Sequence, residues 1–228
     1  MLGLTAAMVL LGSLQSTANS TATSASAAAT GRVSGKVELL DSKGRPHKSH
    51  AHAVVYLEDV PGPLPEGIPT EHTIRQEGKA FLPEINVVVK GSTVDFPNED
   101  KFFHNVFSVS RPARFDLGLY RHGESKSVEF KRPGVVDIYC NIHPDMAAKV
   151  LVLDSGYFAQ SSEDGSFSIE GVPAGTYPVR AWHANGDMWS GEVEVKAGGK
   201  SSLSISLKDD GRTGAHLRKD GTPYGRYK

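Results

Sequence analysis

The chain has 228 residues, of which 39% are hydrophobic and 22% charged, and its formal net charge is -1. This composition is typical of one large or two small globular domains and excludes wholesale disorder. A net charge near zero provides no overall field to attract nucleic acid or an anionic membrane surface. No apolar run reaches the roughly 18 residues that a membrane-spanning helix needs.

The N-terminal residues have the pattern of an export signal. Residues 2–14 are almost wholly apolar or small, and a Ser/Thr/Ala tract follows that ends in ASAAA at 25–29. An apolar segment before such small residues predicts a secretory signal peptide over 1–29, although the usual Lys or Arg at its start is missing. A low-complexity N-terminus is the alternative. We therefore expect a periplasmic or secreted protein.

Short strands separated by turns account for most of the remaining chain. Twenty-four glycines and 13 prolines punctuate segments of alternating or β-branched residues. Helical periodicity is absent, so the sequence predicts an all-β fold built as a sandwich or barrel. The polar, Gly-rich residues 209–228 have no apolar pattern and predict a mobile tail. The expected strands are 32–39, 53–57, 72–75, 85–89, 93–96, 104–109, 127–130, 135–139, 149–153, 191–195 and 202–207.

The only cysteine of the chain lies in the segment CNIHPDM at 140–146. Cys140, His143 and Met146 bring a thiolate, an imidazole and a thioether to one loop between two expected strands. Soft sulfur ligands combined with imidazole suit copper, and a trigonal site with a weak axial Met needs a second histidine. His104, at the start of another expected strand, fits that role best. The alternative is a buried structural cysteine with an unrelated His and Met at the surface.

A second group of histidines precedes the strand at 53–57. His47, His50 and His52 lie close together in the sequence HKSHAH. Such a run can capture a metal ion loosely, as an auxiliary entry or delivery site. A solvated loop is the interpretation that we favour.

Residues 72–154 resemble the cupredoxin family of blue copper proteins. The resemblance rests on VKGSTVDF at 89–96, HNV at 104–106, the Pro-Gly pair at 133–134 and the C-x₂-H-x₂-M spacing, which is most similar to amicyanin. It implies a Greek-key sandwich over 70–155 that holds one type 1 copper ion cycling between Cu(I) and Cu(II). His104, Cys140 and His143 would then lie in the copper plane, with Met146 axial.

The same resemblance assigns supporting roles to two asparagines that follow ligands. Asn105 is expected to hydrogen-bond to the Cys140 loop and hold it shut, and Asn141 to support the ligands from within that loop. Bonds of this kind orient metal ligands and tune the redox potential.

The regions on either side resemble a second family. Residues 31–57 are similar to the opening of carboxypeptidase-regulatory-like domains, and DGSFSI (164–169) with VPAGTY (172–177) to their middle. This implies a small transthyretin-like sandwich formed by 31–62 and 157–208, with the cupredoxin inserted between its strands. In the alternative, 32–57 only add strands to the cupredoxin. The chain order also resembles periplasmic proteins labelled methylamine utilization proteins.

The leading functional hypothesis is an extracytoplasmic one-electron carrier that is not an enzyme and that exchanges electrons with a cytochrome or dehydrogenase. Copper storage or delivery is one alternative, and a structural or partner-binding module on a cupredoxin scaffold is another. Fold alone does not choose among them. The sequence indicates no nucleic-acid partner, no transmembrane segment and no catalytic residue.

Overall fold

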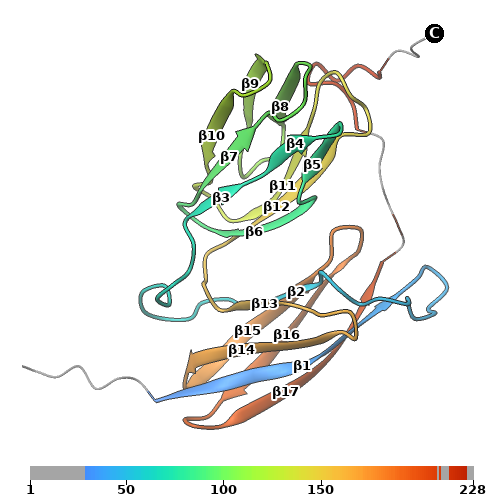
Figure 1. Ribbon diagram of the computed structural model, residues 1–228. Coiled ribbons are helices and arrows are strands. Elements are labelled where there is room, and N and C mark those ends of the chain that lie inside the picture. Colours follow the sequence, from blue (N-terminus) through green and yellow to red (C-terminus); the bar gives the residue numbers. More distant parts are fainter. Residues whose placement is uncertain (1–28, 210, 212–215, 225–228) are drawn as a thin grey trace, which may run out of the picture.

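The computed structural model describes residues 29–209, 211 and 216–224, which form two β-sandwich lobes stacked on each other (Figure 1). All regular elements of these residues are strands, so the all-β prediction is confirmed. Accordingly, the described residues contain no helix long and apolar enough to cross a membrane. The predicted signal peptide over 1–29 falls, apart from its last residue, outside the described residues.

The flanking lobe comprises residues 30–57 and 158–209. In its outer sheet β1 pairs antiparallel with β14 and parallel with β17, and in its inner sheet β2 pairs with both β13 and β15. The insertion hypothesis requires this pairing of the 53–57 segment with strands from the C-terminal part. The outer strands are β1 (Thr30–Leu40), β14 (Ser166–Pro173) and β17 (Lys200–Lys208), and the inner ones β2 (Val54–Leu57), β13 (Phe158–Gln160), β15 (Gly175–Trp182) and β16 (Met188–Val195).

The inserted lobe comprises residues 71–153. One sheet has three strands in the order β10-β7-β3, the other has five in the order β6-β12-β11-β8-β9, and β4 with β5 forms a separate hairpin. Its strands are β3 (Glu71–Thr73), β4 (Arg75–Glu77), β5 (Ala80–Leu82), β6 (Ile85–Val89), β7 (Thr93–Pro97), β8 (His104–Ser108), β9 (Phe115–Tyr120), β10 (Ser125–Glu129), β11 (Gly134–Tyr139) and β12 (Ala147–Leu153).

Two strands are buried on both faces because they lie where the lobes meet. Successive side chains of a strand point to opposite faces. In β12, Val150 and Val152 therefore enter the core of the inserted lobe, while Leu151 and Leu153 face the flanking lobe. There they join Trp182 and the residues of β2 that point away from the flanking core. A third apolar cluster thus packs the two lobes against each other.

β5, β9 and β13 are among the observed strands that lie outside the expected ones. In β9 the apolar residues Phe115, Leu117 and Leu119 alternate in sequence, but burial does not follow them, since Leu119 is 58% exposed and Tyr120 is buried. Gly118 has a φ of 69°, and the pairing of β9 with β8 shifts register between Asn105 and Phe107. This irregularity, typical of a β-bulge, interrupts the alternation of inward and outward side chains along the strand.

Residues 216–224, which belong to the segment predicted as a mobile tail over 209–228, contact the inserted lobe in the structure. This segment, drawn in red at the top of Figure 1, lies against the inserted lobe. The Lys219 amide donates to Asn141 Oδ1 at 3.0 Å, and its Nζ lies 2.6 Å from Asp116 Oδ2. Its contacts are polar and aromatic, so an apolar periodicity could not reveal them. The rest of the tail, apart from 209 and 211, lies outside the described residues.

Candidate metal site

The loop between β11 and β12 is closed by its own backbone. Cys140 follows directly on the last residue of β11, and its amide donates to the carbonyl oxygen of Met146 at 3.1 Å. The Met146 amide in turn donates to the carbonyl oxygen of His143 at 3.2 Å. Pro144 fixes its own φ and biases His143 away from the helical region. Seven residues therefore form a tight turn that returns the chain into β12.

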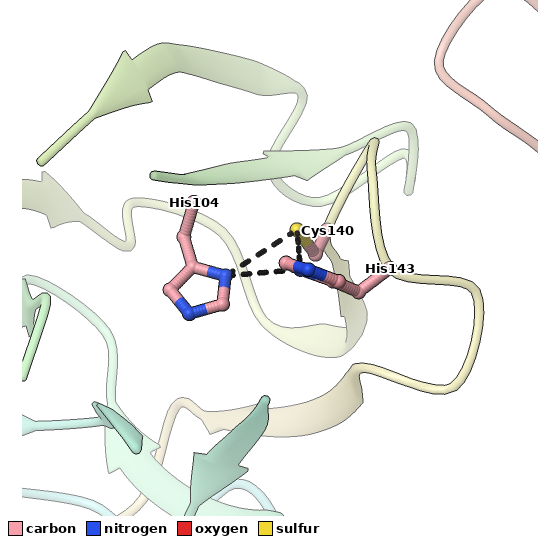
Figure 2. A group of neighbouring side chains, drawn as sticks. All are labelled: His104, Cys140 and His143. Carbon is pink, nitrogen blue, oxygen red and sulfur yellow. Dashed lines mark hydrogen bonds between the residues drawn. The ribbon is translucent and has the colours of Figure 1, made fainter. Parts of the chain in front are cut away.

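His104, the first residue of β8, points toward this loop, and both its side chain and Cys140 are fully buried. Figure 2 shows the side chains of His104, Cys140 and His143 converging. The Cys140 Sγ lies 3.9 Å from His104 Nδ1 and 3.5 Å from His143 Nδ1, and the two Nδ1 atoms lie 3.1 Å apart. The structure thus brings together three of the four residues proposed as ligands through the atoms able to bind a metal.

The size of this triangle fits a metal ion. A triangle with sides of 3.9, 3.5 and 3.1 Å has a point about 2 Å from all three corners, and this matches the length of metal–imidazole and metal–thiolate bonds, about 2.0–2.3 Å. Two imidazole nitrogens and one thiolate sulfur form the donor set of a trigonal copper site. The arrangement of the residues therefore fits copper.

Asp100 determines which nitrogen of His104 is free for a metal. Its Oδ2 lies 2.8 Å from His104 Nε2, which as the donor to a carboxylate carries the ring proton. The Nδ1 lone pair of His104 is then directed at Cys140 and His143. A carboxylate behind a histidine ligand fixes its tautomer and ring orientation in this way.

A hairpin turn holds Asp100 in place. The amides of Gly78 and Lys79, at the turn between β4 and β5, donate to Asp100 Oδ1 and Oδ2 at 2.8 and 2.9 Å. Burial raises the pKa of Asp100, but the bonds from Lys79, His104 and Gly78 outweigh it and leave the pKa below its usual value. Asp100 is therefore a carboxylate at neutral pH. Sequence reasoning missed it, and its position four residues before His104 was the available signal.

His143 lies nearer the surface than His104. Burial, followed by the charges of His104 and Lys79, lowers the pKa of His143, so its imidazole is neutral at neutral pH. The ring of Phe102 contacts both imidazoles edge-on, with centroid distances of 5.2 Å to His104 and 5.8 Å to His143. Phe102 and its neighbour Phe103 are 40% and 54% exposed. An apolar surface thus adjoins the site.

The remaining residues assigned to the site lie near it, with one correction. Met146 is fully buried and shares a core cluster with Cys140. Asn105 does not bridge to the Cys140 loop as expected: its Nδ2 donates to Asp116 Oδ1 at 2.8 Å, and its Oδ1 is buried without a hydrogen-bond partner. The side chain leans toward β9 because the carboxylate of Asp116 is the stronger acceptor there. Asn141 supports the loop from the other side, through Lys219.

The histidines of the flanking lobe are used differently. His50 Nδ1 accepts a hydrogen bond from the Leu39 amide at 3.0 Å, and His47 Nε2 lies 3.2 Å from the carbonyl oxygen of Asp209. Within the described part of the chain, His104, Cys140 and His143 are the one group of three or more His, Cys, Asp or Glu residues close enough to share a metal ion. His47, His50 and His52 therefore do not converge on an auxiliary site.

A curated relative matches the chain in sequence. The match is 34% identical over 77 residues to amicyanin-alpha of Methylorubrum extorquens, and it covers 32% of this chain. It covers 64% of the relative, slightly less than two thirds of its length. Together with the ligand triangle, this similarity decides the family of the inserted lobe. The chain contains a cupredoxin domain.

Comparison with solved structures returns further similar proteins. A purple cupredoxin from Nitrosopumilus maritimus is 22% identical, with 36% of this chain and 98% of that one covered at a TM-score of 0.32. A copper-containing nitrite reductase from Thermus scotoductus is 29% identical, with 40% of this chain and 25% of that one covered at a TM-score of 0.35.

A separate family model matches outside most of the cupredoxin domain. Residues 145–203 match the model of polysaccharide lyase family 4, domain II. The matched stretch runs from the end of the metal-binding loop through β12 into the flanking lobe.

Proposed function

We propose that this protein is a one-electron carrier with a single type 1 copper ion, and not an enzyme. The observation that carries the proposal is the triangle of His104 Nδ1, Cys140 Sγ and His143 Nδ1 at one end of the cupredoxin domain. Similarity to amicyanin supports it. When bound, copper would supply the one-electron couple between Cu(II) and Cu(I).

The residues of the chain would bind the ion and keep its surroundings rigid. His104, Cys140 and His143 would hold it, and Met146, buried beside Cys140, would be the fourth ligand. The tight loop and Asp100 fix the ligands before metal arrives, so little rearrangement would accompany a change of oxidation state. A rigid, partly buried site of this kind suits repeated electron transfer.

Electrons would enter and leave through the His143 side of the site. His143 is the more exposed imidazole, and the ring of Phe102, which is 40% exposed, contacts it edge-on and forms an apolar rim. A partner that docks on this rim excludes water and brings its own redox centre close to the copper. The partner would be a cytochrome or dehydrogenase. Because of the predicted signal peptide, the two proteins would exchange electrons in the periplasm or outside the cell.

For the flanking lobe we propose a carboxypeptidase-regulatory-like sandwich assembled from 31–62 and 157–208, with the cupredoxin domain of 70–155 inserted. The pairing of β2 with β13 and β15 supports this division. An insert is tolerated where its ends emerge close together, and here β2 and β13, which flank the insert, are paired neighbours.

The experiment is to load the purified full chain with Cu(II) and record its visible spectrum and voltammogram. We expect an intense thiolate-to-copper band and a reversible one-electron wave with copper retained. A colourless complex would overturn the proposal. Rapid loss of Cu(I) to a chelator from an otherwise blue protein would instead favour copper delivery.

A further inference from the structure

The C-terminal segment 216–224 makes its contacts at the metal-binding loop. The Tyr224 hydroxyl donates to the carbonyl oxygen of Cys140 at 2.5 Å. The amide of Lys219 donates to the side chain of Asn141, the next residue of the loop, at 3.0 Å. Two consecutive loop residues, one of them the thiolate ligand, are thus held by a segment more than 70 positions away in sequence.

The direction of the Tyr224 hydrogen bond is set by its acceptor, because a carbonyl oxygen only accepts and the hydroxyl must donate. The Tyr224 hydroxyl oxygen also lies 3.2 Å from Nδ1 of His216, which itself lies 3.2 Å from the carbonyl oxygen of Leu217. The ring of His216 therefore lies beside the hydroxyl that contacts the loop.

Further contacts tie the segment to the strands on either side of the site. The ring of His216 stacks on Tyr139, the residue before Cys140, with centroids 4.2 Å apart and planes 17° from parallel. Lys219 Nζ bonds to Asp116, the residue that also holds Asn105 beside the ligand His104. The guanidinium of Arg218 lies 5.4 Å from the Tyr224 ring centroid. These bonds link the segment to β9, β11 and the loop.

We propose that residues 216–224 are a clamp on the metal-binding loop, with Tyr224 as its main positioning residue. The loop is closed by its own backbone bonds between Cys140, His143 and Met146. The clamp adds bonds to the Cys140 carbonyl and to Asn141, two groups that those backbone bonds do not involve. The inference rests on the proposed function: a clamped loop retains copper through repeated electron transfer, whereas a loop that lacks this support releases it.

Tyr224→Phe removes the hydroxyl and keeps the ring, and Tyr177→Phe is the matched control. The Tyr177 hydroxyl also donates to a backbone carbonyl, that of Ala174, but in the flanking lobe. One lost hydrogen bond is worth a factor of about five, so we expect Tyr224→Phe to lose Cu(I) to a chelator about five-fold faster than the parent chain. A chain ending at residue 209 should lose it at least about ten-fold faster, as removal of supporting partners usually does.

A spectroscopic readout separates positioning from general destabilisation. In Tyr224→Phe the thiolate-to-copper band should shift, because the backbone of its sulfur ligand is held differently, while Tyr177→Phe should leave it in place. Equal release rates and identical spectra in all variants would overturn the clamp.

A measurement without copper keeps the clamp testable if the copper function fails. Hydrogen exchange at the amides of residues 141–143 in the metal-free protein should be faster in Tyr224→Phe and in the truncated chain than in Tyr177→Phe. Unchanged exchange there would reject the clamp. A full chain that protects these amides but never becomes blue would reject the electron-carrier proposal alone.

Discussion

The two lobes are both β-sandwiches with apolar cores, but they differ in what they bury at their ends. The inserted lobe buries polar side chains that serve one another, among them Asn98, which orders the Asp100 loop, and His104. The flanking lobe also buries polar side chains, among them His183 and Asp209, which lie 3.3 Å apart. Burying a polar group costs free energy unless it is bonded, so each such group needs a partner. What distinguishes the inserted lobe is that, among the described residues, it alone brings together three side chains able to share a metal ion.

The largest effect should come from the thiolate. Cys140→Ser removes the thiolate ligand, and we expect complete loss of the intense visible band of the copper-loaded protein. Serine has the shape of cysteine and is slightly smaller, so it fits the same buried position. Far-UV circular dichroism should therefore still show the β-sandwich. A persisting band would contradict the ligand assignment, and loss of the band through unfolding would appear in the dichroism.

Between the lobes, Leu151 should matter most for stability. Leu151→Ala removes a fully buried side chain from the cluster shared by β12, β2 and β15, which should lower the free energy of unfolding by about 2–5 kcal/mol. The Leu151 side chain packs against residues of both lobes. We therefore expect the two lobes to unfold in a single transition, and the substitution to shift that transition as a whole. Val152→Ala, which faces only the inserted core, is the comparison. Two separate transitions in the parent chain would show that the lobes unfold independently.

A smaller effect should follow from Asp100→Asn. The amide keeps the shape of the side chain but no longer holds the Nε2 proton of His104 as a carboxylate does, so copper affinity should fall about 10- to 100-fold. Competition titration with a Cu(I) chelator measures this. Asp137→Asn, which disrupts only a partly exposed ion pair with Lys149, should leave the affinity unchanged. Equal copper affinities in Asp100→Asn and Asp137→Asn would show that Asp100 does not support the site.

The smallest effect belongs to the flanking lobe. Bonds from the Arg45 amide, the Arg45 side chain and the Lys43 amide lower the pKa of Asp41 to about 2. A depressed carboxyl pKa adds stability above its unfolded value, near 4, and this contribution disappears as the pH falls toward 2. Asp41→Asn should therefore reduce stability slightly at pH 6 and not at pH 2. Thermal melts of the parent chain and of Asp41→Asn across that pH range measure the difference. Melting temperatures that differ by the same amount at every pH would contradict the prediction.

The sequence by itself indicated most of the strands and the candidate metal ligands Cys140 and His143. Alternation of apolar residues follows from the two-residue period of a strand, and the loop ligands lie within seven residues, where local geometry alone brings them together. The choice of His104 rested on chemistry, since a trigonal site needs a second imidazole, and the structure places its Nδ1 at the site. Strand β9 was not predicted, and the irregularity at Gly118 leaves Leu119 exposed and Tyr120 buried, so its burial does not follow the apolar alternation of its sequence.

Only the tertiary structure decided which polar residues serve the site. Asp100 reaches His104 because the turn of a hairpin more than 20 residues earlier holds its carboxylate. Asn105 turns to Asp116 instead of the loop, and Tyr224 reaches Cys140 across 84 positions. Hydrogen bonds of this kind are specific in space but leave no periodic trace in sequence, because a single polar side chain at a distant position suffices to make each one.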